Sequence, residues 1–282
     1  MIAIVSNIMM TELHTIDAYD GLCKAERIMD EKDISCLPVI NQGKPVGILT
    51  SGDIRKAHPN RIVADAMSKH IISVVPDISL WKAQQIFEEN ITEVLLVIDE
   101  ERLVGLVTKT CLYTELGKYI DILTGLYRSD YIYYTGMELL ERGIEVSVIF
   151  IDLNKFGMID KEHGHIHGDT VLKEVGMLLK SHTPDETFLC RFGGDEFIVL
   201  TQYKLDQCKA LAEMLLEAIS LHEFSNNIRV TAAAGIAGGR RDEAREYDPF
   251  ETIAKLVNLA SLASTKAKME KTRIAFTDGF CM

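Results

Sequence analysis

The first 115 residues carry the same pattern of apolar and polar positions twice. In each copy, apolar residues at helical spacing are followed by an apolar strand, a polar turn and a second strand that ends in Thr. The copies align without a gap, and the expected elements are helices over 21–33 and 79–90, first strands over 36–40 and 94–98, and second strands over 45–50 and 103–108. A repeat this short cannot bury both faces of its sheet alone. We therefore expect the two copies to pack on each other as a pseudo-dimer.

A different alternation of strands and helices follows this repeat. A helix expected over 113–121 joins the two regions, either as a passive linker or as a path that transmits the ligand state of the repeats. The second region is expected to contain strands over 145–152, 228–237 and 273–276, helices over 171–180 and 204–221, a hairpin over 188–200, and a last helix that starts near Pro249 with Asp248 as its cap. This order predicts an α/β fold, in which a palm-like, antiparallel-containing sheet is flanked by helices. The predicted boundaries are 1–58 and 59–115 for the repeats, 116–126 for the linker and 127–282 for the second domain.

Composition narrows the classes of partner. The 282 residues carry a formal net charge of −12 and give a pI of about 5.2, which argues against a dedicated binder of nucleic acid or anionic membranes. The longest apolar runs are far shorter than the ~20 residues of a membrane-spanning helix, and the N-terminus lacks the pattern of a secretion signal. The six cysteines show no CxxC spacing, so we expect a reducing, cytoplasmic location.

The run RFGGDEF places two carboxylates at the tip of the expected hairpin. Gly193 and Gly194 are expected to supply the positive φ angles of the turn, but a turn does not require two adjacent acids. Asp152 ends the preceding strand, so it meets Asp195 and Glu196 if the two strands are neighbours. Clustered carboxylates form a hard-oxygen site for Mg²⁺ that leaves coordination positions for phosphate oxygens.

The N-terminal repeats resemble a tandem pair of CBS domains. The likeness rests on the strand–turn–strand–helix layout, the length of each copy and the phrasing M…LPV…GILT, over about residues 1–115. It implies a cleft between the copies in which family members commonly bind adenine nucleotides. Copy one keeps Thr50 and a ribose-binding Asp53, whereas copy two has Cys111 at the equivalent position, so one occupied site is expected. Asp53 fits a helix cap equally well, and both interpretations remain open.

The second region resembles the GGDEF family of diguanylate cyclases, over about residues 118–277. The motif D-x-L-T-G-L precedes RFGGDEF, and between the two stand Asp152, Phe156, Gly164-His165 and Gly168-Asp169. The resemblance implies a homodimer in which each GGDEF domain holds one GTP. Each 3′-hydroxyl then attacks the α-phosphorus of the other GTP, which yields cyclic di-guanylate and pyrophosphate.

The same resemblance assigns residues to the metal ions. Two divalent cations per site, Mg²⁺ or Mn²⁺, would be held by the side chains of Asp152 and Asp195 and by the backbone carbonyl of Leu153. Glu196 would either help to bind the metal or activate the attacking hydroxyl. Positioning and metal electrostatics, which dominate phosphoryl chemistry in general, would then carry the reaction.

The substrate contacts are assigned in the same way. The backbone of Gly193 and Gly194 would lie against the α-phosphate, and Asp169 would accept hydrogen bonds from the guanine. Backbone amides around Lys155 and the ammonium of Lys268 would hold the outer phosphates. The full set of expected substrate contacts is Phe156, Gly157, Asp160, His165, Asp169, Gly193, Gly194 and Lys268.

Several positions depart from the family pattern. Gly157 stands where the family usually has a phosphate-binding Lys, and Asp160 stands where it has a guanine-binding Asn. Pro184 and Thr187 replace the product-inhibition residues, so feedback through that site is expected to be absent. One hypothesis is a diguanylate cyclase regulated by an adenine nucleotide. The alternative is a degenerate domain that binds GTP without efficient turnover and acts as a sensor or interaction module. We favour the first because the hairpin and metal residues are complete.

Overall fold

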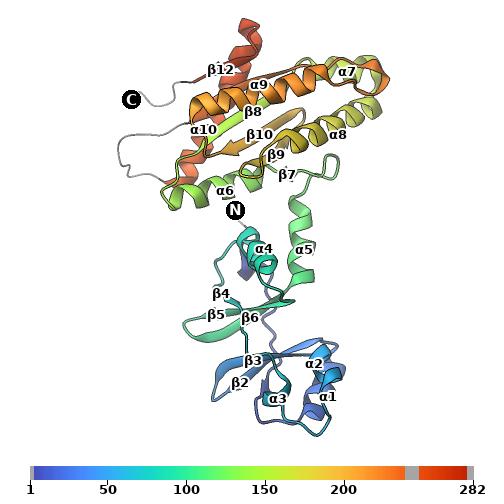
Figure 1. Cartoon of the computed structure of the whole chain (residues 1–282), viewed down its shortest axis with the longest axis vertical. Helices are drawn as coiled ribbons and strands as arrows, with labels where there is room; N and C mark the ends of the chain where they lie inside the picture. The colour runs from blue at the N-terminus through green and yellow to red at the C-terminus, as the bar shows by residue number, and fades with distance from the viewer. Residues whose placement is uncertain (1–2, 239–247, 278–282) are drawn as a thin grey trace. The chain divides into compact units, whose positions relative to one another are not determined.

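The computed structural model describes residues 3–238 and 248–277, which fall into two compact units, Met1–Lys118 and Tyr119–Met282 (Figure 1). Each unit has its own sheets and its own buried apolar clusters. Within the described ranges, no helix combines the length and apolar character needed to cross a lipid bilayer.

The N-terminal unit contains two three-stranded sheets, one from each copy of the repeat. In copy one, β1 (Ile16–Asp17) is parallel to β2 (Cys36–Asn41), which pairs antiparallel with β3 (Lys44–Thr50). In copy two, β4 (Ser73–Val74), β5 (Val94–Asp99) and β6 (Arg102–Thr108) pair in the same way. The helices are α1 (Leu22–Lys32), α2 (Ser51–Lys56), α3 (Val63–Ala66), α4 (Leu80–Glu89) and α5 (Lys109–Leu116).

Close packing explains a Met–Gly pair that occurs in both copies. A Cβ built on Gly47 would lie 2.6 Å from the sulfur of Met67, and a Cβ built on Gly105 would lie 2.7 Å from the sulfur of Met9. Each glycine therefore leaves room for a methionine to cross the strand. Apolar residues from both copies share one cluster, which contains Cys36, Ile48, Val94, Leu96 and Leu106. The copies pack on each other, as the sequence predicted.

The sheet of the C-terminal unit has six strands in the order β12–β11–β8–β10–β9–β7. The central strand β8 (Ser147–Leu153) is antiparallel to both of its neighbours, β10 (Glu196–Thr201) and β11 (Ala232–Gly238). Next to β10 lies β9 (Phe188–Gly193), again antiparallel. The edge strands β7 (Tyr127–Arg128) and β12 (Ile274–Phe276) are parallel to the strands that they join.

Helices cover both faces of this sheet because its central strands are apolar on both sides. Along β8, Ile149 and Ile151 join the cluster formed with α8 and α9, whereas Val148 and Phe150 join the cluster formed with α6 and α10. The helices of this unit are α6 (Ser129–Glu141), α7 (Phe156–His163), α8 (His165–His182), α9 (Leu205–Leu221) and α10 (Pro249–Glu270).

Three boundaries differ from the sequence prediction. The segment expected to be irregular after β8 forms α7 and the first turn of α8, because Gly164 at φ 85° ends one helix and begins the next. Strand β11 begins at Ala232, later than expected, because its partner β8 ends opposite that residue. The linking helix is α5 (Lys109–Leu116), which ends earlier than expected and gives way to a 3-10 turn over Gly117–Tyr119.

Candidate active site

The hairpin β9–β10 carries the GGDEF residues at its turn. Gly193 pairs with Glu196 across the two strands, so Gly194 and Asp195 form a two-residue loop. Of the two glycines only Gly194 has a positive φ, 51°, which corrects the prediction that both would supply one. At Gly193, no atom beyond its chain neighbours lies within 4 Å of the position that a Cβ would take. The loop backbone is therefore open to the approach of a ligand.

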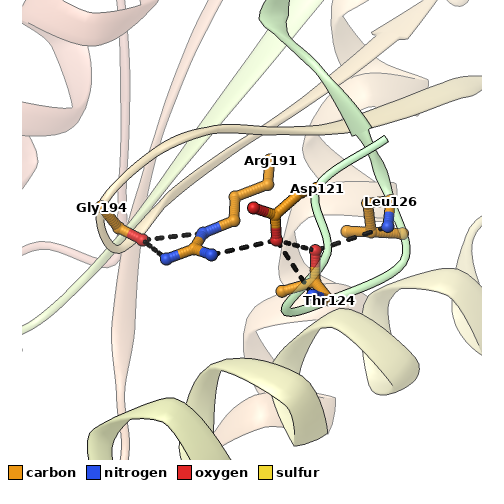
Figure 2. Close-up of polar contacts among 5 residues, drawn as sticks. All are labelled: Asp121, Thr124, Leu126, Arg191 and Gly194. Atoms are coloured by element: carbon orange, nitrogen blue, oxygen red, sulfur yellow. Dashed lines mark hydrogen bonds and ion pairs between the residues drawn. The ribbon is translucent and has the colours of Figure 1, made fainter. Parts of the chain in front are cut away.

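An arginine fixes this loop from within the motif (Figure 2). Nε and Nη2 of Arg191 donate to the carbonyl oxygen of Gly194 at 3.0 and 2.7 Å, and Nη1 donates to Oδ1 of Asp121 at 3.0 Å. The same carboxylate oxygen accepts from the backbone N–H and the hydroxyl of Thr124 at 2.9 and 2.7 Å. The D-x-L-T-G-L turn thus anchors the loop that carries the acids.

The sequence prediction used Asp121 only as a family marker and assigned no role to Arg191. Burial alone would raise the pKa of Asp121, but hydrogen bonds from Thr124 and Arg191 outweigh it and leave the pKa below its usual value. The sequence held no specific signal for this contact, because an arginine near a turn can equally be solvated by water. Its partner, 70 positions away, could not be identified from spacing alone.

Three acidic residues, Asp152, Asp195 and Glu196, lie where β8 and β10 meet the loop. The Cα atoms of Asp152 and Glu196 are direct partners in the antiparallel ladder, and the N–H of Leu153 donates to the carbonyl of Asp195 at 3.2 Å. Burial raises the pKa of both Asp195 and Glu196, and the nearby charge of Asp152 raises it further. Carboxylates that resist ionisation together favour a cation between them.

A lysine from α10 reaches the same place. Nζ of Lys268 lies 2.5 Å from Oδ1 of Asp152 and donates to the carbonyl oxygen of Leu153 at 2.8 Å. In residues 3–238 and 248–277, no three His, Cys, Asp or Glu side chains are already grouped so as to hold a metal ion. The donors fit Mg²⁺ in kind, because all are hard oxygens. In this structure the ammonium of Lys268 contacts two of these oxygens, Oδ1 of Asp152 and the carbonyl oxygen of Leu153.

The residues expected to bind guanine lie on α7 and α8. Oδ2 of Asp160 is 3.1 Å from Nδ1 of His165, and the same carboxylate lies so close to Gly168 that a Cβ there would collide with it. Phe156 also borders Gly168. Asp169, by contrast, is exposed on α8. The structure therefore brings Phe156, Asp160 and His165 together at the start of α8, next to Gly168. Asp169 is the residue that follows Gly168.

A groove of about 810 Å³ opens beside Lys268. Its basic lining residues are Lys155, Arg229, Lys268, Lys271 and Arg273, and Glu162 is its acidic lining residue. Across the described part of the chain, Lys268 is the member of this basic set that has an acid within ion-pair distance. Four of these five cations have no carboxylate partner among the residues that the structure describes, so the groove favours anions.

Asp53 in the N-terminal unit forms a reciprocal helix cap. The hydroxyl of Thr50 accepts from the N–H of Asp53 at 3.2 Å, and the carboxylate of Asp53 accepts from the N–H and hydroxyl of Thr50 at 2.9 and 2.6 Å. The capping interpretation is realised, and the ribose contact stays a prediction. A cavity of about 200 Å³ lies beside Thr108 in copy two, lined also by Met10, His14 and Cys36.

Comparison with known proteins agrees with both resemblances. Residues 118–273 match the GGDEF domain of diguanylate cyclases. The chain belongs to the GGDEF family. Residues 5–60 and 63–118 each match the CBS domain, so a tandem CBS pair precedes the GGDEF domain.

Two curated relatives are themselves named diguanylate cyclases. Diguanylate cyclase DgcS of Shewanella oneidensis is 32% identical over 123 residues, which are 42% of this chain and 41% of the relative. Diguanylate cyclase A of Treponema denticola is 30% identical over 159 residues, which are 52% of this chain and 41% of the relative. The chain thus spans about two fifths of the length of these relatives.

A solved structure shares the fold. The crystal structure of the diguanylate cyclase SiaD in complex with its activator SiaC, from Pseudomonas aeruginosa, aligns with a TM-score of 0.51 at 20% identity. The alignment covers 70% of this chain and 68% of that one. Together with the family match, this establishes a diguanylate cyclase-type domain at the C-terminal end of the CBS pair.

Proposed function

We propose that this GGDEF protein condenses two GTP molecules into cyclic di-guanylate in the cytoplasm, as a homodimer in which each protomer holds one GTP. The observation that carries the proposal is the pairing of Asp152 with Glu196 across β8 and β10, with Asp195 in the adjoining loop. Each 3′-oxygen forms a bond to the α-phosphorus of the other GTP, and the bond between that phosphorus and the β-phosphate oxygen breaks. Two pyrophosphates leave, and the two hydroxyl protons pass to a base.

The oxygen donors at this edge suit a pair of Mg²⁺ or Mn²⁺ ions. The carboxylates of Asp152, Asp195 and Glu196 and the carbonyl of Leu153 would hold them, and when bound they neutralise phosphate charge and polarise the α-phosphate. Glu196 would either share in holding these ions or accept the proton of the 3′-hydroxyl. The open backbone at Gly193 allows the α-phosphate to approach.

The basic groove supports binding of a triphosphate despite the missing family lysine. Gly157, at the position of that lysine, contributes no cation, and nothing lies within 4 Å of where its Cβ would be. Arg229, Lys271 and Arg273 line the groove next to Lys268. We place the β- and γ-phosphates there, with these side chains in the role that Gly157 cannot fill.

Product analysis tests the proposal directly. Purified full-length protein with Mg²⁺ and GTP should yield cyclic di-guanylate by mass spectrometry, and Asp195→Asn should abolish the product. Asp206→Asn, which removes an exposed acid in the first turn of α9, is the matched control and should leave the rate unchanged. No product above a no-enzyme blank, at high protein concentration and long incubation, would reject the cyclase.

One observation favours the second candidate, a GTP-binding domain with inefficient turnover. Asp160 stands in the place of a guanine-binding Asn and lies 3.1 Å from Nδ1 of His165. An ionised carboxylate accepts hydrogen bonds but cannot donate one to a guanine oxygen. Calorimetry that shows GTP binding without pyrophosphate release would support this candidate. A large gain in turnover from Asp160→Asn combined with Gly157→Lys would show that these two positions limit the reaction.

We further propose that the CBS pair binds an adenine nucleotide or a related ligand and so regulates the GGDEF domain. The CBS matches and the Thr50–Asp53 pair support a ligand in copy one. A ribose would take over the carboxylate that Thr50 now occupies. Titration with AMP, ADP and S-adenosylmethionine, with Asp53→Asn as the comparison, tests this by calorimetry and by the effect on cyclase rate. Equal affinity of wild type and Asp53→Asn for the ligand would show that the ligand does not bind at Asp53 of copy one.

A further inference from the structure

The ammonium of Lys268 occupies the two oxygens at which the proposed metal ion would bind. Its Nζ bridges Oδ1 of Asp152 at 2.5 Å and the carbonyl oxygen of Leu153 at 2.8 Å. Lys268 comes from α10, 115 residues after Leu153, so this contact depends on the tertiary fold rather than on local chain geometry. The side chain is only 29% exposed, which limits the water available to replace either partner.

We propose that Lys268 acts as an internal competitor for the divalent cation and leaves these oxygens only when a triphosphate arrives. The inference rests on the proposed function. A metal ion binds oxygen at about 2.0–2.1 Å, so an ion on either oxygen would stand within about 5 Å of the ammonium. A dication and an ammonium that close, and partly shielded from water, repel each other strongly. The metal alone therefore binds only if the lysine withdraws.

The basic groove provides the place to which the lysine withdraws. Lys268 already lines that groove, together with Arg229, Lys271 and Arg273. A triphosphate in the groove supplies the anionic oxygens that the ammonium needs after it leaves Asp152 and Leu153. Metal and nucleotide then bind cooperatively, because the nucleotide removes the competitor of the metal. The proposal makes Lys268 a positioning residue that couples the two binding events.

The test measures Mn²⁺ binding to the whole protein by electron paramagnetic resonance, first without nucleotide. Lys268→Met should bind Mn²⁺ about tenfold more tightly than wild type, since removing a neighbouring positive charge favours the dication. Lys268→Arg keeps the charge and should bind as weakly as wild type. Lys266→Met is the matched control on the same helix, because Lys266 is 59% exposed and its ion pair is with Glu270, at 4.0 Å. It should not change Mn²⁺ affinity.

A nonhydrolysable GTP analogue completes the experiment. In wild type, the analogue should tighten Mn²⁺ binding by a larger factor than in Lys268→Met, because the competitor is already gone in the variant. Unchanged or weaker Mn²⁺ binding by Lys268→Met would overturn the proposal, and Lys268→Gln provides the same measurement if the Met variant does not fold. Metal binding is measured without turnover, so a failed cyclase assay leaves this result interpretable.

Discussion

Replacement of Asp121 by Asn is expected to loosen the GGDEF hairpin while the N-terminal unit stays folded. The carboxylate of Asp121 accepts hydrogen bonds from Thr124 and from Arg191, and Arg191 in turn holds the carbonyl of Gly194. Asn keeps the shape of the side chain but offers a single neutral oxygen. The Arg191 side chain, only 13% exposed, then loses its charged partner.

The size of the effect follows from this geometry. A hydrogen bond to a charged group contributes about 1.5–3 kcal/mol, and isolating one member of a fully buried ion pair costs about 3–5 kcal/mol. Asp121 is 19% exposed, so solvent screens part of the interaction. We expect the C-terminal unit to lose about 2–3 kcal/mol of unfolding free energy, which lowers its melting temperature by about 4–12 °C.

Two spectroscopic signals separate the two units in urea unfolding. The single tryptophan, Trp81, is buried in the N-terminal unit, so its fluorescence reports that unit alone, whereas far-ultraviolet circular dichroism reports both. Asp121→Asn should shift the dichroism transition and leave the fluorescence transition in place. A double-mutant cycle with Arg191→Met then isolates the pair. A coupling energy below about 0.5 kcal/mol would refute the anchoring role.

The pH dependence gives an independent check. Burial would raise the pKa of Asp121, but hydrogen bonds from Thr124 and Arg191 leave it below the ordinary value of 3.8. A lowered folded-state pKa gives stability that is present above the unfolded-state pKa and is lost as the pH falls through the folded-state pKa. The advantage of wild type over Asp121→Asn should therefore be complete near pH 7 and shrink below about pH 4. An advantage that is constant down to pH 3 would contradict the argument.

Three further outcomes are expected. Arg273→Gln should weaken GTP binding about threefold to tenfold in calorimetry and leave GMP binding unchanged, because only GTP reaches the groove with its outer phosphates, and the exposed Lys180→Gln should change neither. Gly235→Ala should destabilise the C-terminal unit by about 3 kcal/mol or more in urea unfolding, since its Cβ would collide with the backbone of α10, which cannot rotate away. Exposed Cys23 should react with a thiol reagent in the native protein, whereas Cys190 should react only on unfolding, because burial strongly raises the pKa of its thiol.

The features of this fold that the sequence predicted are those that local patterns determine. The helix cap at Asp248, which accepts from the N–H groups of Phe250 and Glu251, needed only an acid before Pro249 and was predicted. Asp152 ends one expected strand and Glu196 stands at the tip of the hairpin, so the two acids were expected to meet if the strands are neighbours, and the ladder pairs them.

The features that were missed depend on a single backbone conformation and on a contact between distant residues. The break between α7 and α8 is set by Gly164 at a positive φ, and a single Gly inside a polar stretch does not reveal on which side a helix continues. The Arg191–Asp121 pair joins residues 70 positions apart. Periodicity describes one element at a time, so it contains no information about which cation reaches which acid.

Three carboxylates that the sequence marks as ligand-binding are each held by a donor of the protein itself. Asp53 accepts from Thr50, Asp160 lies against His165, and Asp152 is bridged by Lys268. A ligand at any of these places exchanges one hydrogen-bond partner for another, so its affinity reflects the difference between the two partners and not the full strength of the new contact. The donors also keep each carboxylate paired before the ligand binds, which avoids the cost of a partly buried, unpaired charge. Binding at the proposed adenine, guanine and metal positions would therefore exchange side-chain partners, and at the proposed metal position the partner to be displaced is the Lys268 ammonium.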